Sequence, residues 1–331
     1  MSIELNDLQK KAKGGTEMMV ERLSTLDKEL LSHFQIIPSR VESLNPDKVR
    51  VLWCHDTAQD PMNHHLQNNG WKRFHKIVFV SYWQREQFKL FYGIPHSRTK
   101  VIRNAIDYNP VYRDHIVKKI NSDQIRLIYH TTPHRGLNIL VPVVDELSKK
   151  YPNIHLDVYS SFEIYGWKER DEQYKELFDR IRNHPNMSYH GTVSNTTVRE
   201  ALKRAHIFAY PSIWPETSCL ALIEALASGC LSVVPDYAAL PETGATSAWI
   251  YDWHENEEDH KEIFKNELEN AIKYWLKDPD AEELITQADI HEARYSWVSR
   301  SLQWINFLES IKDLPTAIED ARPDFVYRTP I

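Results

Sequence analysis

Two glutamates in the second half of the chain, Glu216 and Glu224, have the surroundings of residues that hold a ligand. In residues 210–243 a strand ends, a turn follows, an apolar helix starts near Cys219, and a second strand begins after Gly229. A buried carboxylate such as Glu224 needs a partner, which is often a ligand hydroxyl. The free N–H groups at the helix start form an anion site. A phosphate-bearing ligand with sugar hydroxyls would satisfy both features.

The stretch around these glutamates, PSIWPETSCLALIEALASGC, resembles a known enzyme family. It is similar to the E-x7-E region of the retaining nucleotide-sugar glycosyltransferases of family 4, the glycogen-synthase-like and mannosyltransferase-like enzymes. The resemblance implies the α/β GT-B fold, in which two Rossmann-like, doubly wound domains face each other across a cleft and a C-terminal helix crosses back to the first domain. The glutamates alone would also fit a plain helix, and the flanking residues favour the family.

This resemblance assigns roles along the stretch. Glu224 would hold the ribose hydroxyls of the donor, and Glu216 would face the donor sugar as a catalytic residue, although not as a nucleophile. Amides or hydroxyls near the start of the helix would contact phosphate or sugar, and they belong to Thr217, Ser218, Cys219 and Leu220.

A second loop carries the expected partner of the donor diphosphate. It follows the predicted strand 125–130, and the family places a basic residue just before the glycine of this loop, here Gly136. Arg135 occupies that place, and a guanidinium can bridge two phosphate oxygens. Thr131 and Thr132 stand where many relatives carry a further arginine. Arg135 and the helix amides would therefore neutralise the leaving diphosphate in place of a divalent metal ion.

The first half of the chain resembles the family less closely. Gly14 and Gly15 precede a helix, and the family's corresponding loop lies near the donor phosphates and the acceptor. Only SIEL precedes this loop, so the family's first strand is missing, very short or supplied differently. His55, after the predicted strand 49–54, would be the catalytic histidine beside the donor sugar, with Asp56 in support.

Two other turns complete the resemblance. His190, Thr192 and Val193 match a turn that lies against the nucleotide base in the family. Residues 104–107, NAID, occupy the place of the family's N-G-[IV]-D and favour a structural role.

The positioning elements follow a regular alternation of strands and helices, which predicts parallel sheets whose ligands bind beyond the carboxyl ends of the strands. We expect an N-terminal acceptor-side domain over residues 1–112, a nucleotide-sugar domain over 113–294, and a crossover helix and tail over 295–331. The predicted helices include 16–31, 82–92, 137–151, 168–183 and one opened by a Thr197–Glu200 capping box. The predicted strands are 33–38, 49–54, 76–80, 100–103, 125–130, 155–160, 187–190, 207–210 and LSVVP after Gly229.

Composition limits the function classes. The chain has 331 residues, 42% hydrophobic content and a net charge of −7, which gives no general footprint for nucleic acid. No apolar run has transmembrane length and no signal-peptide core is evident, so we expect a cytoplasmic protein, free or peripheral at a membrane surface. Three cysteines show no metal or redox spacing. Asp278 and Asp280 form a D-x-D that is typical of a turn and a cap.

No dinucleotide, Walker A or nucleophile-elbow motif occurs. The sequence therefore predicts a metal-independent retaining glycosyltransferase that needs no cofactor and uses a UDP-sugar or a GDP-sugar. The acceptor stays open among a glycan, a lipid-linked sugar, a small molecule and a modified nucleic acid, and the oligomeric state is not predicted. The alternatives are a degenerate sugar-nucleotide-binding protein without turnover and a GT-B epimerase.

Overall fold

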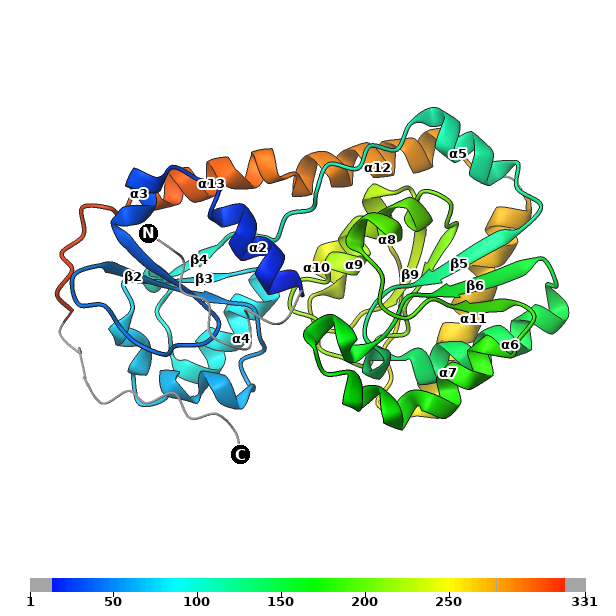
Figure 1. Cartoon of the computed structure of the whole chain (residues 1–331), viewed down its shortest axis with the longest axis horizontal. Coiled ribbons are helices and arrows are strands. Elements are labelled where there is room, and N and C mark those ends of the chain that lie inside the picture. The colour runs from blue at the N-terminus through cyan, green and yellow to red at the C-terminus, as the bar shows by residue number, and fades with distance from the viewer. Residues whose placement is uncertain (1–13, 278, 319–331) are drawn as a thin grey trace. The chain divides into compact units, whose positions relative to one another are not determined.

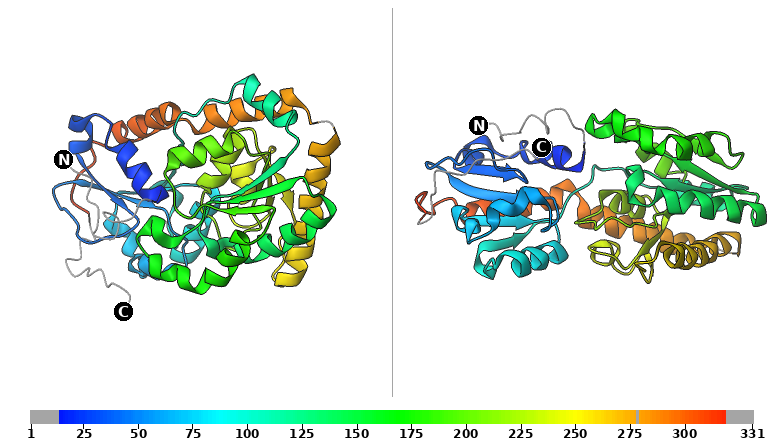
Figure 2. Two further views of the ribbon diagram at one scale, coloured as in Figure 1. Left: turned by 45° about the vertical axis from the view of Figure 1, so that its right-hand side comes forward. Right: turned by 90° about the horizontal axis from the view of Figure 1, so that it is seen from below.

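The computed structural model describes residues 14–277 and 279–318. Two compact units divide the chain (Figures 1 and 2): the first unit contains Met1–Ala105 and Tyr295–Ile331, and the second contains Ile106–Arg294. The boundary between the two units lies between Ala105 and Ile106, whereas the sequence pattern suggested a boundary after residue 112. Both units contain a parallel sheet covered by helices, which confirms the predicted α/β class.

The first unit contains a four-stranded parallel sheet in the order β1-β2-β3-β4. Its strands are β1 (Phe34–Pro38), β2 (Val49–Cys54), β3 (Lys76–Phe79) and β4 (Thr99–Val101). All residues of β1 and β2 are buried, as expected for parallel strands covered on both faces. The helix α4 (Tyr82–Tyr92) begins at Ser81, whose side chain accepts from Gln84 N, and ends at Gly93. Short 3₁₀ turns occupy Pro61–Leu66, Gly70–Arg73 and His96–Arg98.

The prediction of one helix over 16–31 is wrong, because two helices, α2 (Gly15–Leu23) and α3 (Lys28–Ser32), share that range. The Ser24 and Thr25 hydroxyls donate to backbone carbonyls three residues earlier and end the first helix. The carboxylate of Asp27 then accepts from Leu30 N and begins the second helix. The residues SIEL lie outside the described part of the chain.

The last helix of the described residues, α13 (Trp297–Glu309), belongs to the first unit, as the resemblance implied. Its Trp304 is buried against Trp53 of β2, with ring centroids 4.8 Å apart. After the helix, the carbonyl oxygen of Pro315 lies 2.8 Å from His75 Nε2. The end of the described chain is therefore tied to the sheet of the first unit.

The second unit contains a six-stranded parallel sheet in the order β10-β9-β8-β5-β6-β7. β5 pairs with β6 on one side and with β8 on the other, and later strands are added outward on each side. The carboxyl ends of β5 and β8 therefore lie at the topological switch point of the sheet, where ligands usually bind. The strands are β5 (Ile125–Tyr129), β6 (Ile154–Val158), β7 (Met187–Tyr189), β8 (Ile207–Ala209), β9 (Leu231–Pro235) and β10 (Trp249–Tyr251). The strand β10 was not predicted.

Helices cover both faces of this sheet, as Figure 1 shows, with α6, α7 and α11 on one face and α8, α9 and α10 on the other. These helices are α6 (Leu137–Lys150), α7 (Lys175–Arg182), α8 (Asn195–Leu202), α9 (Leu220–Ala227), α10 (Leu240–Gly244) and α11 (Glu257–Lys277). The unit also contains α5 (Arg113–Ile120), and α12 (Ala281–Tyr295) ends at its boundary. Three short 3₁₀ segments are Pro133–Arg135, Phe162–Tyr165 and Lys168–Tyr174.

Two predicted helix starts are corrected by the structure. Ser194, whose hydroxyl accepts from Thr197 N, begins α8, so the predicted Thr197–Glu200 capping box is wrong. Glu200 instead pairs with Lys203 one turn later. The first half of the predicted helix 168–183 is a 3₁₀ segment and only its second half is α-helical. Asp280 accepts from the amides of the first turn of α12, in agreement with a capping role, and Asp278 lies outside the described residues.

Candidate functional site

The loops after β5 and β8 approach each other closely at the carboxyl edge of the second unit's sheet. Gly136 has a φ of +117°, and a Cβ atom at this position would lie 2.1 Å from the carbonyl oxygen of Pro211. Only glycine fits such an approach. This contact places Arg135, which precedes the glycine, beside the turn that carries Glu216.

Arg135 and Glu216 form a close ion pair. Arg135 Nη1 lies 2.5 Å from Glu216 Oε1, and the hydroxyl of Tyr210 donates to the same oxygen at 2.5 Å. The side chains of Arg135 and Glu216 are 20% and 7% exposed. Burial is the largest single influence and lowers the pKa of Arg135, but Glu216, Tyr165 and Tyr210 together raise this pKa above its ordinary value. Both bonds end on Oε1, so Oε2 makes no hydrogen bond to any residue that the structure describes.

The predicted role of Arg135 therefore needs one addition. Its Nη1 is engaged by Glu216 and its Nε donates to Thr132 Oγ1 at 3.1 Å. Because a guanidinium has several N–H donors, these bonds fix the group without using all of it. The sequence places Arg135 and Glu216 on separate loops, and the structure brings them together.

Aromatic side chains surround this ion pair. Trp214 is 42% exposed, and the guanidinium of Arg135 lies 5.7 Å from the centroid of its ring. The ring of His134 packs edge-on against Trp214 and stacks on Phe162. Burial lowers the pKa of His134 to about 4, so this ring is neutral at physiological pH. These rings offer an apolar surface next to a charged one.

The start of α9 has the properties of an anion site. Cys219 precedes the helix without a side-chain cap, and the hydroxyl of the buried Ser218 makes no hydrogen bond to other residues within the described ranges. Thr217 and Leu220 flank them and are half-buried. Open N–H groups at a helix start attract negative charge.

Glu224 lies one turn into α9, with its side chain 17% exposed. His130, at the end of β5, is 4% exposed, and its Nε2 lies 4.0 Å from Glu224 Oε2. Burial lowers the pKa of His130 to about 4, and the backbone of Ala221 opposes this shift. The sequence interpretation missed His130, although its place at the carboxyl end of a central strand could have singled it out.

The predicted base-binding turn lies farther along the sheet. His190 follows β7, the edge strand, and stacks on Tyr159 with ring centroids 4.3 Å apart. Its Nε2 lies 2.9 Å from Asp157 Oδ1. Thr192 is exposed and Val193 is half-buried. The ring of His190 therefore contacts Tyr159 and Asp157 of the same unit, and it lies two strands away from β5 in the sheet.

In the first unit, the glycine loop and His55 have local partners. Gly14 N donates to Glu17 Oε2 at 2.8 Å, which caps the N-terminus of α2. Gly15 is the first residue of this helix. His55 N donates to Ser39 Oγ at 3.1 Å, and burial lowers the pKa of its ring to about 3.

Asp56 is half-buried, and desolvation and then Asp60 raise the pKa of its carboxyl group. At the end of β4, Asn104 is buried, and its Oδ1 has no hydrogen-bond partner in the described part of the chain.

Residues 14–277 and 279–318 contain neither a metal-binding cluster nor a disulfide bond. No group of three or more His, Cys, Asp or Glu side chains there is placed to hold a metal ion. Cys54, Cys219 and Cys230 are buried free thiols. In the same ranges, every helix is too short or too polar to cross a bilayer.

Comparison with known proteins places this site in a family context. A family model described as "Glycosyl transferases group 1" matches residues 113–292, more than half of the chain. A human phosphatidylinositol N-acetylglucosaminyltransferase subunit is 26% identical over 166 residues, which cover 50% of this chain and 33% of that protein. The corresponding Arabidopsis thaliana protein is 25% identical over 167 residues, covering 50% and 36%. The match thus spans about a third of these curated relatives.

Solved structures share the fold. The Anabaena protein Alr3699/HepE, determined in complex with UDP-glucose, superposes with a TM-score of 0.60 at 17% identity and covers 80% of this chain and 72% of its own. A glycosyltransferase from Rickettsia africae superposes with a TM-score of 0.62 at 14% identity, covering 95% and 85%. These similarities support the GT-B assignment of the fold.

Proposed function

Because the chain belongs to the glycosyl transferases group 1 family, we propose that it is a retaining enzyme that moves a sugar from a nucleoside diphosphate-sugar to an acceptor hydroxyl. The observation that carries this proposal is the Arg135–Glu216 pair beside the open start of α9. It combines a fixed positive charge, an anion site and a carboxylate with one open oxygen at a single edge of the sheet. A diphosphate linked to a sugar presents the complementary groups.

The reaction that we propose uses these residues as follows. The bond between the anomeric carbon and the phosphate oxygen breaks, and negative charge develops on the leaving diphosphate. Arg135 and the N–H groups at the start of α9 stabilise this charge. The acceptor oxygen attacks the same face of the sugar, and its proton passes to the leaving phosphate oxygen. Retention thus needs no protein nucleophile, and Glu216 orients the donor sugar through Oε2.

Other residues complete the proposed set. Glu224 holds ribose hydroxyls, while Thr217, Ser218, Cys219 and Leu220 line the phosphate side. His190, Thr192 and Val193 contact the base. On the first unit, His55 contacts the donor sugar as a neutral donor, and Gly14 and Gly15 belong to the loop near the donor phosphates and the acceptor.

The donor is a UDP-sugar or a GDP-sugar, and the reaction uses no metal ion and no cofactor. The names of the curated relatives make N-acetylglucosamine the first sugar to examine, and phosphatidylinositol the first acceptor. A glycan, another lipid-linked sugar, a small molecule or a modified nucleic acid would use the same donor chemistry.

A donor panel tests this proposal. The chain is incubated with labelled UDP-glucose, UDP-N-acetylglucosamine and GDP-mannose in the presence of EDTA, and released nucleotide is measured with and without acceptors. We expect slow hydrolysis of one donor without acceptor, and NMR of the transfer product should show the anomeric configuration of the donor. A product of inverted configuration, or complete loss of turnover in EDTA that metal restores, would refute the mechanism. Donor binding without any turnover would instead identify a binding protein.

A further inference from the structure

A buried histidine at the centre of the second unit's sheet has polar atoms that the protein leaves unused. His130 follows β5 directly, its side chain is 4% exposed, and its ring packs 5.0 Å from that of Phe208. Neither Nδ1 nor Nε2 makes a hydrogen bond of ordinary geometry to a residue that the structure describes, although the backbone of Ala221 interacts with the ring. Because a buried polar atom without a partner is unfavourable, such a group indicates a place where a ligand can bind.

The nearest carboxylate defines where that ligand lies. Nε2 of His130 is 4.0 Å from Oε2 of Glu224, which is too long for a hydrogen bond between them. A single oxygen atom between the two groups could reach both at ordinary hydrogen-bond distances. Glu224 is partly exposed and His130 is not, so the bridging atom would enter from the side of Glu224.

The chemistry of the two groups selects the bridging atom. A carboxylate only accepts hydrogen bonds, while a neutral imidazole can donate one through Nε2–H. The bridging group must therefore donate to Glu224 and accept from His130, as a hydroxyl does. A phosphate oxygen would be repelled by the carboxylate, and an aliphatic group would offer the imidazole no acceptor.

We propose that His130 and Glu224 together bind one ribose hydroxyl of the donor nucleotide, with His130 donating to its oxygen and Glu224 accepting its proton. This assignment rests on the proposed function and adds to it a residue that selects ribonucleotides. The low pKa of His130 keeps the imidazole neutral at physiological pH, which leaves one nitrogen as a donor. His130 then contributes geometry to the site, whereas Arg135 contributes charge.

Calorimetric titration with UDP and GDP, and with their 2′-deoxy and 3′-deoxy analogues, tests this assignment. We expect the unaltered chain to bind its preferred ribonucleotide at least about tenfold more tightly than one of the two analogues. His130→Phe, which keeps a planar ring, should weaken binding of the ribonucleotide by about tenfold and abolish that discrimination. His130→Gln, which keeps a donor, should recover part of both.

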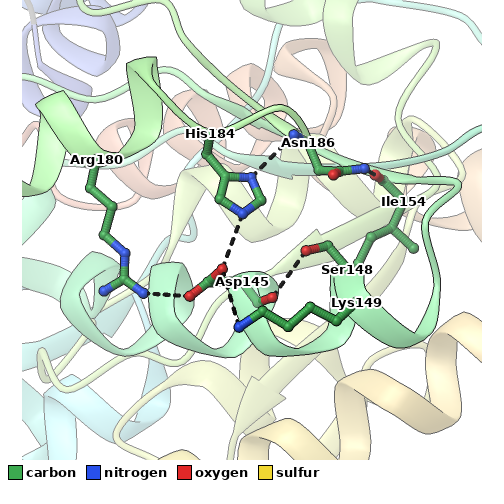
Figure 3. A network of polar contacts seen from close by, with 7 residues as sticks. All are labelled: Asp145, Ser148, Lys149, Ile154, Arg180, His184 and Asn186. Atoms are coloured by element: carbon green, nitrogen blue, oxygen red, sulfur yellow. Dashed lines mark hydrogen bonds and ion pairs between the residues drawn. The ribbon is translucent and has the colours of Figure 1, made fainter.

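The matched control is His184→Gln, in the network of Figure 3, where the imidazole has partners within the protein. This variant should bind ribonucleotides and deoxy analogues as the unaltered chain does. Undiminished discrimination in His130→Phe, or in His130→Leu if the first variant does not fold, would overturn the ribose assignment alone. If the unaltered chain binds no nucleoside diphosphate at all, the proposed function falls with it.

Discussion

The polar groups around α6 and those at the carboxyl edge of the second unit's sheet differ in how their histidines are bonded. In Figure 3, Asp145 of α6 accepts from Arg180 at 2.8 Å and from His184 at 3.2 Å, and His184 Nδ1 accepts from Asn186 N at 3.1 Å. The side chain of Asn186 then donates to the carbonyl of Ile154. Each of these groups finds its partners within the chain.

At the carboxyl ends of β5 and β6, buried polar atoms lack such partners. They include both ring nitrogens of His130, Nδ1 of His134 and Oγ of Ser160, none of which has a hydrogen-bond partner in the described ranges. A folded protein tolerates this cost where a ligand supplies the missing bonds. Around α6 the polar groups hold the helices in place, whereas at the carboxyl ends of β5 and β6 they remain available to a ligand.

The largest expected effect concerns Arg135. Arg135→Ala removes the charge that would stabilise the leaving diphosphate and also releases Glu216, so kcat should fall by about two to three orders of magnitude. Arg135→Lys should recover part of this, because the charge returns without the planar fork. Steady-state kinetics with the preferred donor measure both variants. A near-normal kcat in Arg135→Ala would show that the phosphate site lies elsewhere.

Glu224→Gln should weaken donor binding or turnover by at least about tenfold, because a charged hydrogen bond to a hydroxyl is lost. The fold should survive, since Glu224 is partly exposed and the amide has the same shape. Calorimetry gives the affinity and circular dichroism checks the fold. Unchanged affinity and kinetics in a folded variant would contradict the ribose role.

The buried histidine at the carboxyl end of β5 should also make stability depend on pH. Burial lowers the pKa of His130 to about 4 from an ordinary 6.5, so the unfolded chain takes up this proton first as the pH falls. The stability linked to neutral His130 is complete above pH 6.5 and is lost as the pH falls towards 4. Over this range His130→Gln should lose less stability than the unaltered chain, by about 1.4 kcal/mol for each pH unit. Urea unfolding at several pH values measures the difference, and parallel curves would contradict it.

Tyr210→Phe should lower kcat by about threefold to tenfold with little change in donor affinity. The hydroxyl of Tyr210 shares Glu216 Oε1 with Arg135, so its removal loosens the carboxylate without unpairing it. Because a purely structural role would leave kcat unchanged in the folded variant, separate values of kcat and KM test the assignment.

Asp145→Ala should have the smallest effect on function, leaving kcat and KM unchanged and lowering the free energy of unfolding by about 1 kcal/mol. The loss follows from releasing Arg180 and His184. Urea unfolding and steady-state kinetics provide the two readouts. A change in kinetics equal to that of Tyr210→Phe would erase the distinction between the two regions.

Much of this architecture could be predicted because it is local. Apolar runs of strand length identified β1, β2 and β5, and the residues around Glu216 identified the loop-helix unit. The three-residue β10 was too short for such a pattern. The break between α2 and α3 depends on hydroxyl and carboxylate bonds to the backbone that hydrophobic periodicity does not register.

The site was predicted as a set of separate residues and not as a geometry. Arg135 and Glu216 are far apart in the chain, and their contact depends on the approach of Gly136 to Pro211. His130 was missed because a histidine at a strand end has no fixed spacing to Glu224. What identifies it is the absence of hydrogen-bond partners for its ring within the described residues, which a sequence does not display.

The close approach of Gly136 to Pro211 also limits how this edge can move. Because backbone touches backbone there, the loop of Arg135 cannot shift without carrying the loop of Glu216 with it. An incoming diphosphate would therefore meet a guanidinium that Glu216 and Thr132 already hold in place, and it would use the N–H donors that these two bonds leave over. Binding would then require neither a loop rearrangement nor an exchange of partners at Arg135.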